Sequence, residues 1–375
     1  MWPLLLALLT LTVFALPLLP SVLEWRRRRD IRPLPIDGEH TLDVAAVAAT
    51  FRAMIERQDE RSGQRGMAHP VSALRPVVYV TGAFMPTRAE AFMGVCGRTI
   101  VTSGSLALPD SYTFSRDIYG RRGISTGRRN CVQTLLSEGE ILMRTGSELR
   151  RWAHARSVHV EPQCRLQGPL SALYAIRLED GCEFASVSAA VIGFGPRHTA
   201  APPVVDGMDG MDGMDTVDGK GPQAGNWTHA VLDSAGTDGR WLVTHDLTFP
   251  ANTLYRGDLV VHGDLWIGTG ARIIGSVKAS GSIWLGTRVR IDGALIAAGA
   301  ISVARECAIA GPVASEREID VGARSVIGAA ARRTTVVAPL LRVHAGTVVY
   351  GAASALEEGR VVPDGHLAID LMHPA

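Results

Sequence analysis

Aliphatic residues recur every 18 positions in the C-terminal half of the chain. Three columns hold isoleucine, leucine or valine in four successive periods: Leu265, Ile283, Ile301 and Ile319; Ile267, Leu285, Val303 and Val321; Ile273, Ile291, Ile309 and Ile327. Within each period the apolar positions alternate at a spacing of two, which is typical of strands that turn alternate side chains toward a core. Glycines recur with the same period. The pattern therefore predicts short strands joined by glycine-containing corners.

A coil of 18 residues with three sides places each residue above the one 18 positions earlier. The columns then become continuous aliphatic ladders inside a tube. No single coil buries its own apolar face, but stacked coils bury a shared one. Each inward isoleucine, leucine or valine stabilises such a stack by roughly 1.5–3 kcal/mol. We predict an all-β fold, a parallel β-helix (β-solenoid) of 18-residue coils, for residues 239–353.

A weaker copy of this pattern precedes it. Residues 97–102 match residues 239–244, and residues 164–169 match residues 307–312. Two aliphatic columns continue the pattern here with slightly irregular periods: Ile124, Ile141, Val158 and Ile176; Val132, Leu149, Leu166 and Phe184. We therefore predict that residues 97–198 form a degenerate second β-helix, so that the fold is duplicated.

The N-terminal segment predicts a membrane anchor. Residues 2–23 carry no charged side chain, and the run Arg26 to Arg29 follows closely. A helix of this length, at about 1.5 Å per residue, just crosses a bilayer core of roughly 30 Å. A cleavable signal peptide would instead carry its charge before the apolar stretch. We predict a single-pass transmembrane helix at residues 1–25 in the inner (cytoplasmic) membrane, with the arginines at anionic lipid and the C-terminal part in the cytoplasm.

Three further segments connect or flank these units. Residues 26–96 are a juxtamembrane segment with a short helix, in which Leu42, Ala45, Ala48, Phe51 and Ile55 fall at helical spacing and form an apolar face for a neighbouring element. Residues 199–238 are an acidic linker rich in glycine, aspartate and methionine, predicted to be a flexible tether. Its repeated aspartates lack the spacing of two and the closing bidentate carboxylate of a calcium loop. Residues 354–375 are a C-terminal tail, the segment expected to cover the last coil.

Composition gives little support to catalysis or to nucleic-acid binding. The chain is 46% hydrophobic but only 6% aromatic, and its 40 glycines suit a repetitive aliphatic core with tight corners. The net charge of +1 favours neither nucleic acid nor an acidic substrate. The cysteines are five in number and form no C-x-x-C pair: Cys96, Cys131, Cys164, Cys182 and Cys307. We interpret them as reduced, buried thiols of a cytosolic protein.

The motifs that suggest chemistry are isolated. Gly268-Thr269-Gly270 matches the start of a dinucleotide fingerprint, but no strand-to-helix context follows it. The histidines His245, His262 and His344 occur singly, and we expect each to point outward from the β-helix. The sequence has no G-x-S-x-G, H-E-x-x-H or P-loop motif. We therefore predict no catalytic, cofactor-binding or metal-binding residue, and a protein that is not an enzyme.

The run from Gly257 to Gly268, GDLVVHGDLWIG, followed by ARIIGSVKA at residues 271–279, resembles the bactofilins, a family of polymer-forming bacterial cytoskeletal proteins. The resemblance covers residues 247–353, and it reaches residues 106–184 through the internal copy. It implies a right-handed β-helix, nucleotide-independent polymerisation and a membrane-associated scaffold role. The implied partners are other copies of the chain, membrane lipid, and cell-envelope or morphogenesis proteins. Typical members carry one β-helix, whereas two are predicted here.

The alternative is a hexapeptide-repeat acyltransferase, a left-handed β-helix whose coils also hold 18 residues. Its aliphatic hexad is visible at Ile267, Ile273, Leu285 and Ile291. That fold prefers small residues four places after each aliphatic, but bulky ones stand there: Val277, Ile283, Val289, Leu295 and Ile301. It also needs a catalytic base, usually histidine, for which only the isolated histidines are candidates. Periodicity alone does not fix the handedness of the coil.

Overall fold

The computed structural model of the chain describes residues 44–63, 77–196, 215–218 and 239–364. The predicted transmembrane helix lies outside these residues, as do most of the predicted linker and the end of the predicted tail. No helix in the described part of the chain is long and apolar enough to cross a bilayer.

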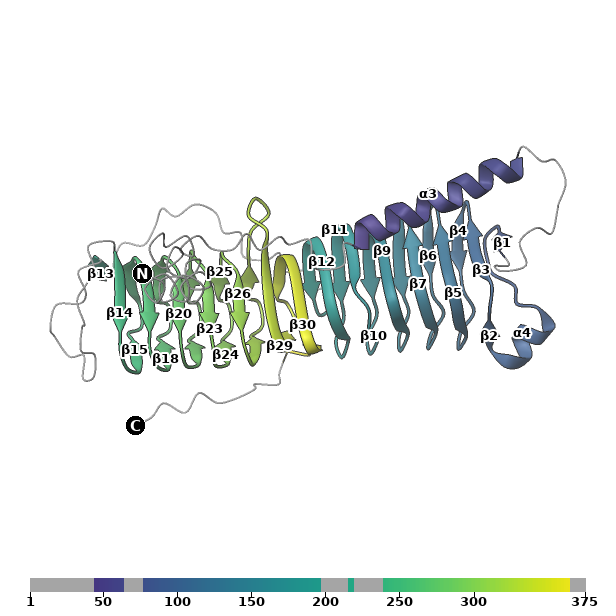
Figure 1. Cartoon of the computed structure of the whole chain (residues 1–375). Coiled ribbons are helices and arrows are strands. Elements are labelled where there is room, and N and C mark those ends of the chain that lie inside the picture. Colours follow the sequence, from purple (N-terminus) through teal and green to yellow (C-terminus); the bar gives the residue numbers. More distant parts are fainter. Residues whose placement is uncertain (1–43, 64–76, 197–214, 219–238, 365–375) are drawn as a thin grey trace, which may run out of the picture. The chain divides into compact units, whose positions relative to one another are not determined.

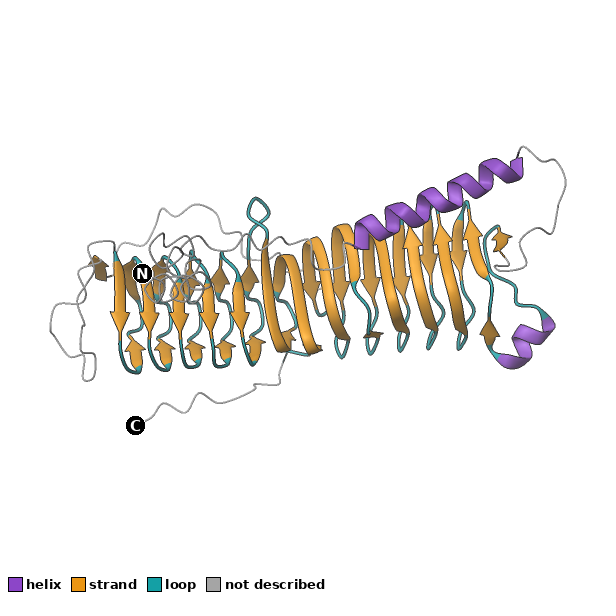
Figure 2. Ribbon diagram, in the orientation of Figure 1, coloured by secondary structure: helices purple, strands orange, loops and turns teal. Residues whose placement is uncertain are grey.

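The described residues form a parallel β-solenoid of about 14 turns with few helices, as the all-β prediction requires (Figures 1 and 2). We call residues 77–195 the N-terminal stack and residues 240–362 the C-terminal stack. The strands of the N-terminal stack are β1 (Val77–Val80), β2 (Val95–Cys96), β3 (Thr99–Thr102), β4 (Ser105–Ala107), β5 (Thr113–Gly120), β6 (Gly123–Ser125), β7 (Cys131–Ser137), β8 (Glu140–Met143), β9 (Glu148–Val160), β10 (Arg165–Leu166), β11 (Leu170–Leu178) and β12 (Glu183–Phe194).

The C-terminal stack follows β13 (Asp215–Asp218), which lies within the predicted linker. Its strands are β14 (Arg240–Val243), β15 (Leu247–Phe249), β16 (Thr253–Arg256), β17 (Asp258–Val261), β18 (Leu265–Ile267), β19 (Arg272–Ile274), β20 (Val277–Ala279), β21 (Ile283–Leu285), β22 (Arg290–Ile291), β23 (Leu295–Ala297), β24 (Ile301–Val303), β25 (Ala308–Ile309), β26 (Val313–Ser315), β27 (Glu318–Val321), β28 (Val326–Ile327), β29 (Thr334–His344) and β30 (Val348–Val362). The two described helices are α3 (Val44–Gly63) and α4 (Arg88–Met93).

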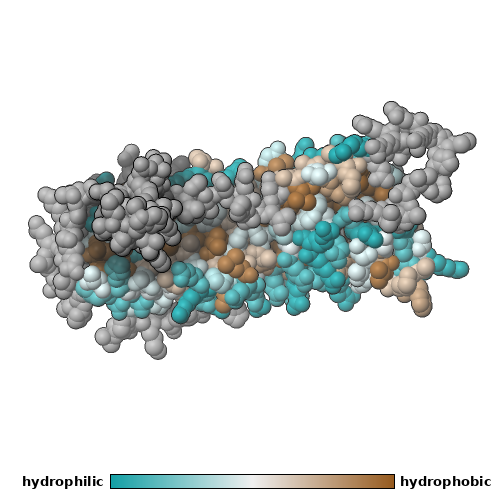
Figure 3. All heavy atoms as spheres, in the orientation of Figure 1, coloured by the Kyte–Doolittle hydropathy of each residue, from teal (hydrophilic) through white to brown (hydrophobic). Residues whose placement is uncertain are grey.

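Strand pairing confirms the predicted register. One column of the C-terminal stack runs through Leu265, Ile283, Ile301 and Ile319. Its counterpart in the N-terminal stack runs through Ile124, Ile141, Val158 and Ile176. Each of these side chains is at most 3% exposed, and the columns of both stacks belong to one buried cluster. Polar side chains cover much of the visible outer surface (Figure 3).

One corner of most coils uses a residue in the left-handed backbone region. Four such residues are glycines: Gly146, Gly181, Gly270 and Gly346. Seven are not: Ser111, Arg129, Gln163, Asn252, Arg288, Glu306 and Arg324. A side chain with a Cβ costs roughly 1–2 kcal/mol in this conformation, whereas glycine adopts it freely. These corners are therefore places where the fold tolerates strain.

Arg288→Gly should raise the free energy of unfolding by up to about 1 kcal/mol, because Arg288 is exposed and its φ is 59°. The matched control is Arg290→Gly, at an exposed strand position, which should lower stability by roughly 0.5–1 kcal/mol. Urea denaturation followed by circular dichroism measures both variants. Equal destabilisation by the two variants would contradict a strained corner at Arg288.

The buried cysteines help to close the same corner, because Cys164, Cys182 and Cys307 each directly follow a residue in the left-handed region. The thiol of Cys307 donates a hydrogen bond to the carbonyl of Gly286 at 3.1 Å, and burial raises the pKa of that thiol to about 12. The Ser325 hydroxyl makes the equivalent bond one coil later, to the carbonyl of Ala304. The thiols of Cys164 and Cys182 donate to earlier carbonyls in the N-terminal stack. All five cysteines are free thiols, and all except the half-buried Cys131 are buried.

Helix α3 lies on the outer face of the N-terminal stack (Figure 1). Its buried Ala48 and Ile55 belong to a small apolar cluster with three side chains of the stack: Val101, Tyr119 and Leu136. The rings of Phe51 and Trp152 meet edge to face at 6.2 Å. The expectation of a helix that packs its apolar face on a neighbouring element is confirmed for Ala48, Phe51 and Ile55, whereas Ala45 is exposed and Leu42 lies outside the described residues.

The coils extend further in both directions than the periodicity indicates. Strand β1 pairs with β3, so the N-terminal stack begins at Val77, inside the segment predicted to be juxtamembrane. Helix α4 is inserted into this first coil, and the insertion breaks the 18-residue period. At the other limit, β30 continues to Val362, so the first part of the predicted tail is strand.

Candidate functional site at the coil ends

The candidate functional surfaces of a β-solenoid are its first and last coils. A terminal coil presents backbone N–H and C=O groups without a neighbouring coil, and such an edge is a template for another strand. We call the first coil of each stack its N-end and the last coil its C-end. The four ends of this chain differ in what covers them.

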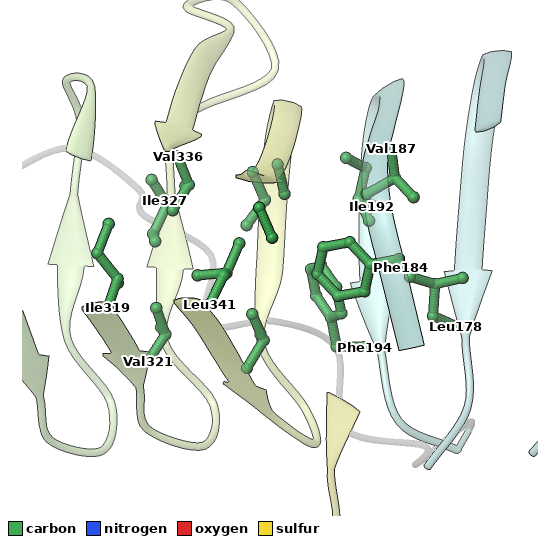
Figure 4. Packing of buried hydrophobic residues seen from close by; sticks show 14 of the residues in the cluster. Leu178, Phe184, Val187, Ile192, Phe194, Ile319, Val321, Ile327, Val336 and Leu341 are labelled. Carbon is green, nitrogen blue, oxygen red and sulfur yellow. The ribbon is translucent and has the colours of Figure 1, made fainter. Parts of the chain in front are cut away.

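The two C-ends cover each other. Strand β12 pairs antiparallel with β30, which joins the N-terminal and C-terminal stacks. The hydroxyls of Ser186 and Ser354 lie 3.0 Å apart across this junction, and Arg360 lies 3.3 Å from Glu183. Figure 4 shows Phe184 and Phe194 facing the aliphatic side chains of the C-terminal stack. The buried core is therefore continuous from one stack into the other.

The register of the junction is symmetric. Phe184 and Val349 hold equivalent positions, above Leu166 and Ile327 in matching columns. Ile192 and Gly359 are likewise equivalent, above Ile176 and Leu341. Phe184 pairs with Gly359, and the reciprocal pair is Ile192 with Val349.

A local two-fold axis follows from these pairs. Val187 and Ala353 also hold equivalent positions, and they pair with each other, so the axis passes between them. This is the geometry of an isologous dimer interface, in which the same surface contributes from both sides. Here the two halves of one chain supply it.

The described part of the predicted tail does not cover the last coil but belongs to it, since residues 354–362 are the end of strand β30; residues 365–375 lie outside the described residues. The cover is the C-end of the other stack, because a duplicated β-helix carries a second edge of the same shape. One residue in the sequence reflects this contact, namely Gly359, which pairs with Phe184. A Cβ there would lie 2.5 Å from the carbonyl oxygen of Phe184 and 2.7 Å from its ring. The glycine makes room for the ring of Phe184.

The N-end of the C-terminal stack is filled by aromatic side chains. Trp241, Phe249 and Tyr255 are at most 2% exposed, with ring centroids 5.8 and 6.3 Å apart for the two pairs that include Tyr255. Strand β13 pairs in parallel with β16 at this coil. The linker prediction is wrong for these four residues, since Asp215–Asp218 form a strand instead of a flexible tether. Asp215, the last aspartate of the repeat, therefore lies in a strand next to the first coil.

At the N-end of the N-terminal stack, aromatic side chains fill the interior, and large apolar side chains are exposed on the outer surface. Phe84 is 3% exposed and meets the ring of Phe114 edge to face at 5.8 Å. Outside, Met85 is 82% exposed and Phe92 is 93% exposed. No sequence pattern marked these side chains, because exposure of an apolar residue outside the periodic columns cannot be read from spacing.

Helix α4 fixes the backbone of this N-end. The Thr87 hydroxyl and the Glu90 carboxylate cap each other's backbone N–H groups, and Gly94 ends the helix in the left-handed conformation. The Arg98 guanidinium donates to Glu90 at 2.7 Å. Burial alone would raise the pKa of Glu90, but hydrogen bonds from Arg98 and Thr87 outweigh it and lower the pKa to about 2. The carboxylate therefore holds the helix in place at every pH above that value.

The residues that the sequence offers as candidates for binding or catalysis do not come together in one site. Gly268-Thr269-Gly270 is a coil corner, with Gly270 in the left-handed region. His262 is exposed and His245 is half-buried, whereas His344 is buried and lies 3.1 Å from Asp320. The expectation of an outward, isolated histidine is wrong for His344, because a neighbouring coil supplies an acidic partner. The described residues hold no group of three metal-ligating side chains.

One shallow hollow of about 340 Å³ lies over the junction. Small residues of both stacks line it, among them Ser188 and Ala352, together with Arg333. Arg333 follows a tight hairpin, bridged between Ala329 and Arg332, which lengthens this coil so that Ile327 pairs with Val349, 22 positions later instead of 18. The hollow brings no acid, base or nucleophile pair together.

Comparison of the chain with models of known families, with curated proteins and with solved structures gives no match in any of the three.

Proposed function

We propose that the chain is a membrane-anchored cytoplasmic scaffold that self-associates through the ends of its β-solenoid, a structural role and not a catalytic one. The observation that carries the proposal is the pairing of β12 with β30. Within one chain, two coil ends of this fold join by antiparallel strand pairing and share a continuous core. Ends of the same construction on different copies have the chemistry to do the same.

The proposal keeps the features that the bactofilin resemblance implies. These are a right-handed β-helix, assembly without a nucleotide, and a place at the inner membrane through residues 1–25 and the arginine run behind them. Its supports in the structure are general: a repetitive coil and buried aliphatic ladders. The acyltransferase alternative lacks comparable support, since neither His245 nor His262 lines the hollow over the junction.

The junction restricts how a scaffold of this kind assembles. Both C-ends are already paired within the chain, so contacts between copies have to use the N-ends. The building block is then the whole chain with its two stacks, not a single β-helix. This explains why a duplicated chain differs in architecture from the single β-helix of typical bactofilins.

Purified full-length chain in detergent micelles should form species larger than one copy, at sizes that ATP and GTP leave unchanged. Light scattering over a hundredfold range of concentration measures the mass. A monodisperse single copy at the highest concentration would contradict the proposal. A compact trimer that binds acetyl-CoA would contradict it in favour of the acyltransferase.

A further inference from the structure

We infer that the surface around a β-bulge in β11, beside the hollow over the junction, is a second membrane contact that binds the anionic lipid headgroups of the bilayer. This inference rests on the proposed membrane anchoring and names the face of the β-solenoid that lies against the bilayer. The surface consists of four exposed side chains, which we call the bulge patch: Arg156, Leu173, Tyr174 and Arg333.

The bulge places two large side chains outside the regular coil. Strand β11 pairs with β9 up to Ala172 and again from Ala175, so Leu173 and Tyr174 together lie opposite the single residue Arg156. Leu173 is 53% exposed and Tyr174 is 61% exposed. An extra residue in one strand re-aims the side chains at that point, and bulges are common at functional sites. Here the bulge presents an aliphatic and an aromatic side chain to the exterior.

The side chains of the bulge patch suit the surface of a membrane. Tyrosine has an apolar ring and a polar hydroxyl, and it is enriched where a bilayer meets water. Exposed arginines flank Tyr174, with Arg156 across the bulge and Arg333 in the hollow that Ala172 also lines. Each arginine close to an anionic leaflet strengthens binding roughly fivefold.

The elements around the bulge patch add to this charge complementarity. The described residues that line the hollow include no carboxylate, and Ser188 and Thr335 supply hydroxyl groups there. Strand β12, in the next coil, carries no charged side chain from Phe184 to Phe194. The first charged side chain of α3 is Arg52. An anionic headgroup at this surface therefore meets arginines and hydroxyl groups.

The start of α3 links the bulge patch to the predicted anchor. Helix α3 begins at the buried Val44 and contacts β11, the strand that carries the bulge (Figure 1). Residues 30–43 separate this start from the arginine run, and a chain of 14 residues spans at most about 50 Å. The chain from the predicted anchor thus joins the β-solenoid at the coil of the bulge. Such a tether raises the concentration of the patch at the bilayer, so a small contact is sufficient.

A protein partner fits the bulge patch less well than lipid does. Both edges of β11 are already paired, with β9 on one side and β12 on the other, so a further strand has no edge to join. A stable protein interface also buries about 800 Å² on each partner, whereas Leu173 and Tyr174 are the two large apolar side chains of the patch. A bilayer needs neither a free strand edge nor a large contact, because the tether supplies part of the affinity.

Fluorescence of the full-length chain in phosphatidylserine-containing vesicles tests the contact. A nitrobenzoxadiazole probe on the thiol of Tyr174→Cys should shift to the blue, and a quencher attached to the lipid chains should quench it. Leu356→Cys is the matched control, since Leu356 is 74% exposed but does not line the hollow, and its probe should remain in water. The unmodified chain, labelled in the same way, gives the background from the half-buried Cys131.

The role of charge is tested in the labelled Tyr174→Cys chain. Arg156→Gln and Arg333→Gln should each shift the equilibrium roughly fivefold toward a probe in water, and vesicles of phosphatidylcholine alone should shift it further. Neither substitution should alter the melting temperature, since both arginines are exposed. Inorganic phosphate added to the chain in detergent micelles should leave the fluorescence unchanged, because the inferred ligand is a headgroup in a bilayer.

The outcomes separate this inference from the proposed function. If the full-length chain does not float with vesicles in a density gradient, the proposed anchoring fails and the inference falls with it. If the chain floats but the probe at residue 174 stays in water, or responds as the probe at residue 356 does, the inference alone fails. A response to inorganic phosphate would assign the patch to a free anion. A shift that depends on chain concentration in micelles would assign it to a second copy, and either result overturns the inference.

Discussion

Ile301→Asp should unfold the C-terminal stack. Ile301 is fully buried and stacks between Ile283 and Ile319, in a column without a polar partner. A carboxylate there is either charged and unpaired or must take up a proton, and the cost is about 3–5 kcal/mol. That is a large part of the stability of an ordinary domain. Thermal unfolding followed by circular dichroism measures the effect.

Arg288→Asp is the control, because it introduces an aspartate at an exposed position instead of a buried one. Arg288 is exposed at a corner, and aspartate tolerates its left-handed backbone, so stability should change by less than about 0.5 kcal/mol. By the duplication, Leu149→Asp should be as damaging in the N-terminal stack, since Leu149 is also fully buried, in the column that corresponds to the one through Ile291. Similar melting curves for Ile301→Asp and Arg288→Asp would show that the inward register is wrong.

The interior of the coils could be predicted because geometry repeats itself there. The coils from Leu265 to Ile319 have the same length, so an inward position such as Ile301 returns after 18 residues and is apolar each time. The degenerate copy was found in the same way, and Leu149 and Leu166 pair as its columns require. The handedness of the coil leaves no such pattern in the sequence, because the residues of a column have the same spacing in left-handed and right-handed coils.

The coil ends could not be predicted, because no repeat constrains them. Because α4 is inserted into the first coil, Val77 pairs with Thr99, 22 positions later instead of 18. The first coil therefore does not follow the period that reveals the others. The pairing of β12 with β30 joins residues far apart in the chain, and only Gly359 marks the contact in the sequence. The candidate site lies at these ends. The parts of the chain most relevant to the proposed function are therefore those about which the sequence says least.

Gly359→Val should separate the two C-ends. The new side chain would need the space that the Phe184 carbonyl and ring occupy, at 2.5 and 2.7 Å from its Cβ. Overpacking of this kind costs roughly 1–3 kcal/mol, which weakens the junction about tenfold to a hundredfold. The measurement uses a full-length chain with a protease recognition sequence inserted between Gly225 and Asn226. After cleavage, the two halves of the parent chain should elute together, and those of the variant should elute apart.

Gly193→Val is the matched control, because it makes the same substitution in the same junction. Gly193 lies on β12 and pairs with Val348, but a Cβ there meets only the flexible end of Arg177, at 3.4 Å. The halves of this variant should therefore stay together after cleavage. If Gly359→Val also keeps its halves together, the contact of Phe184 with Gly359 does not hold the stacks. If the parent halves separate, the pairing of β12 with β30 is too weak to unite them, and the chain is two independent β-helices on one tether.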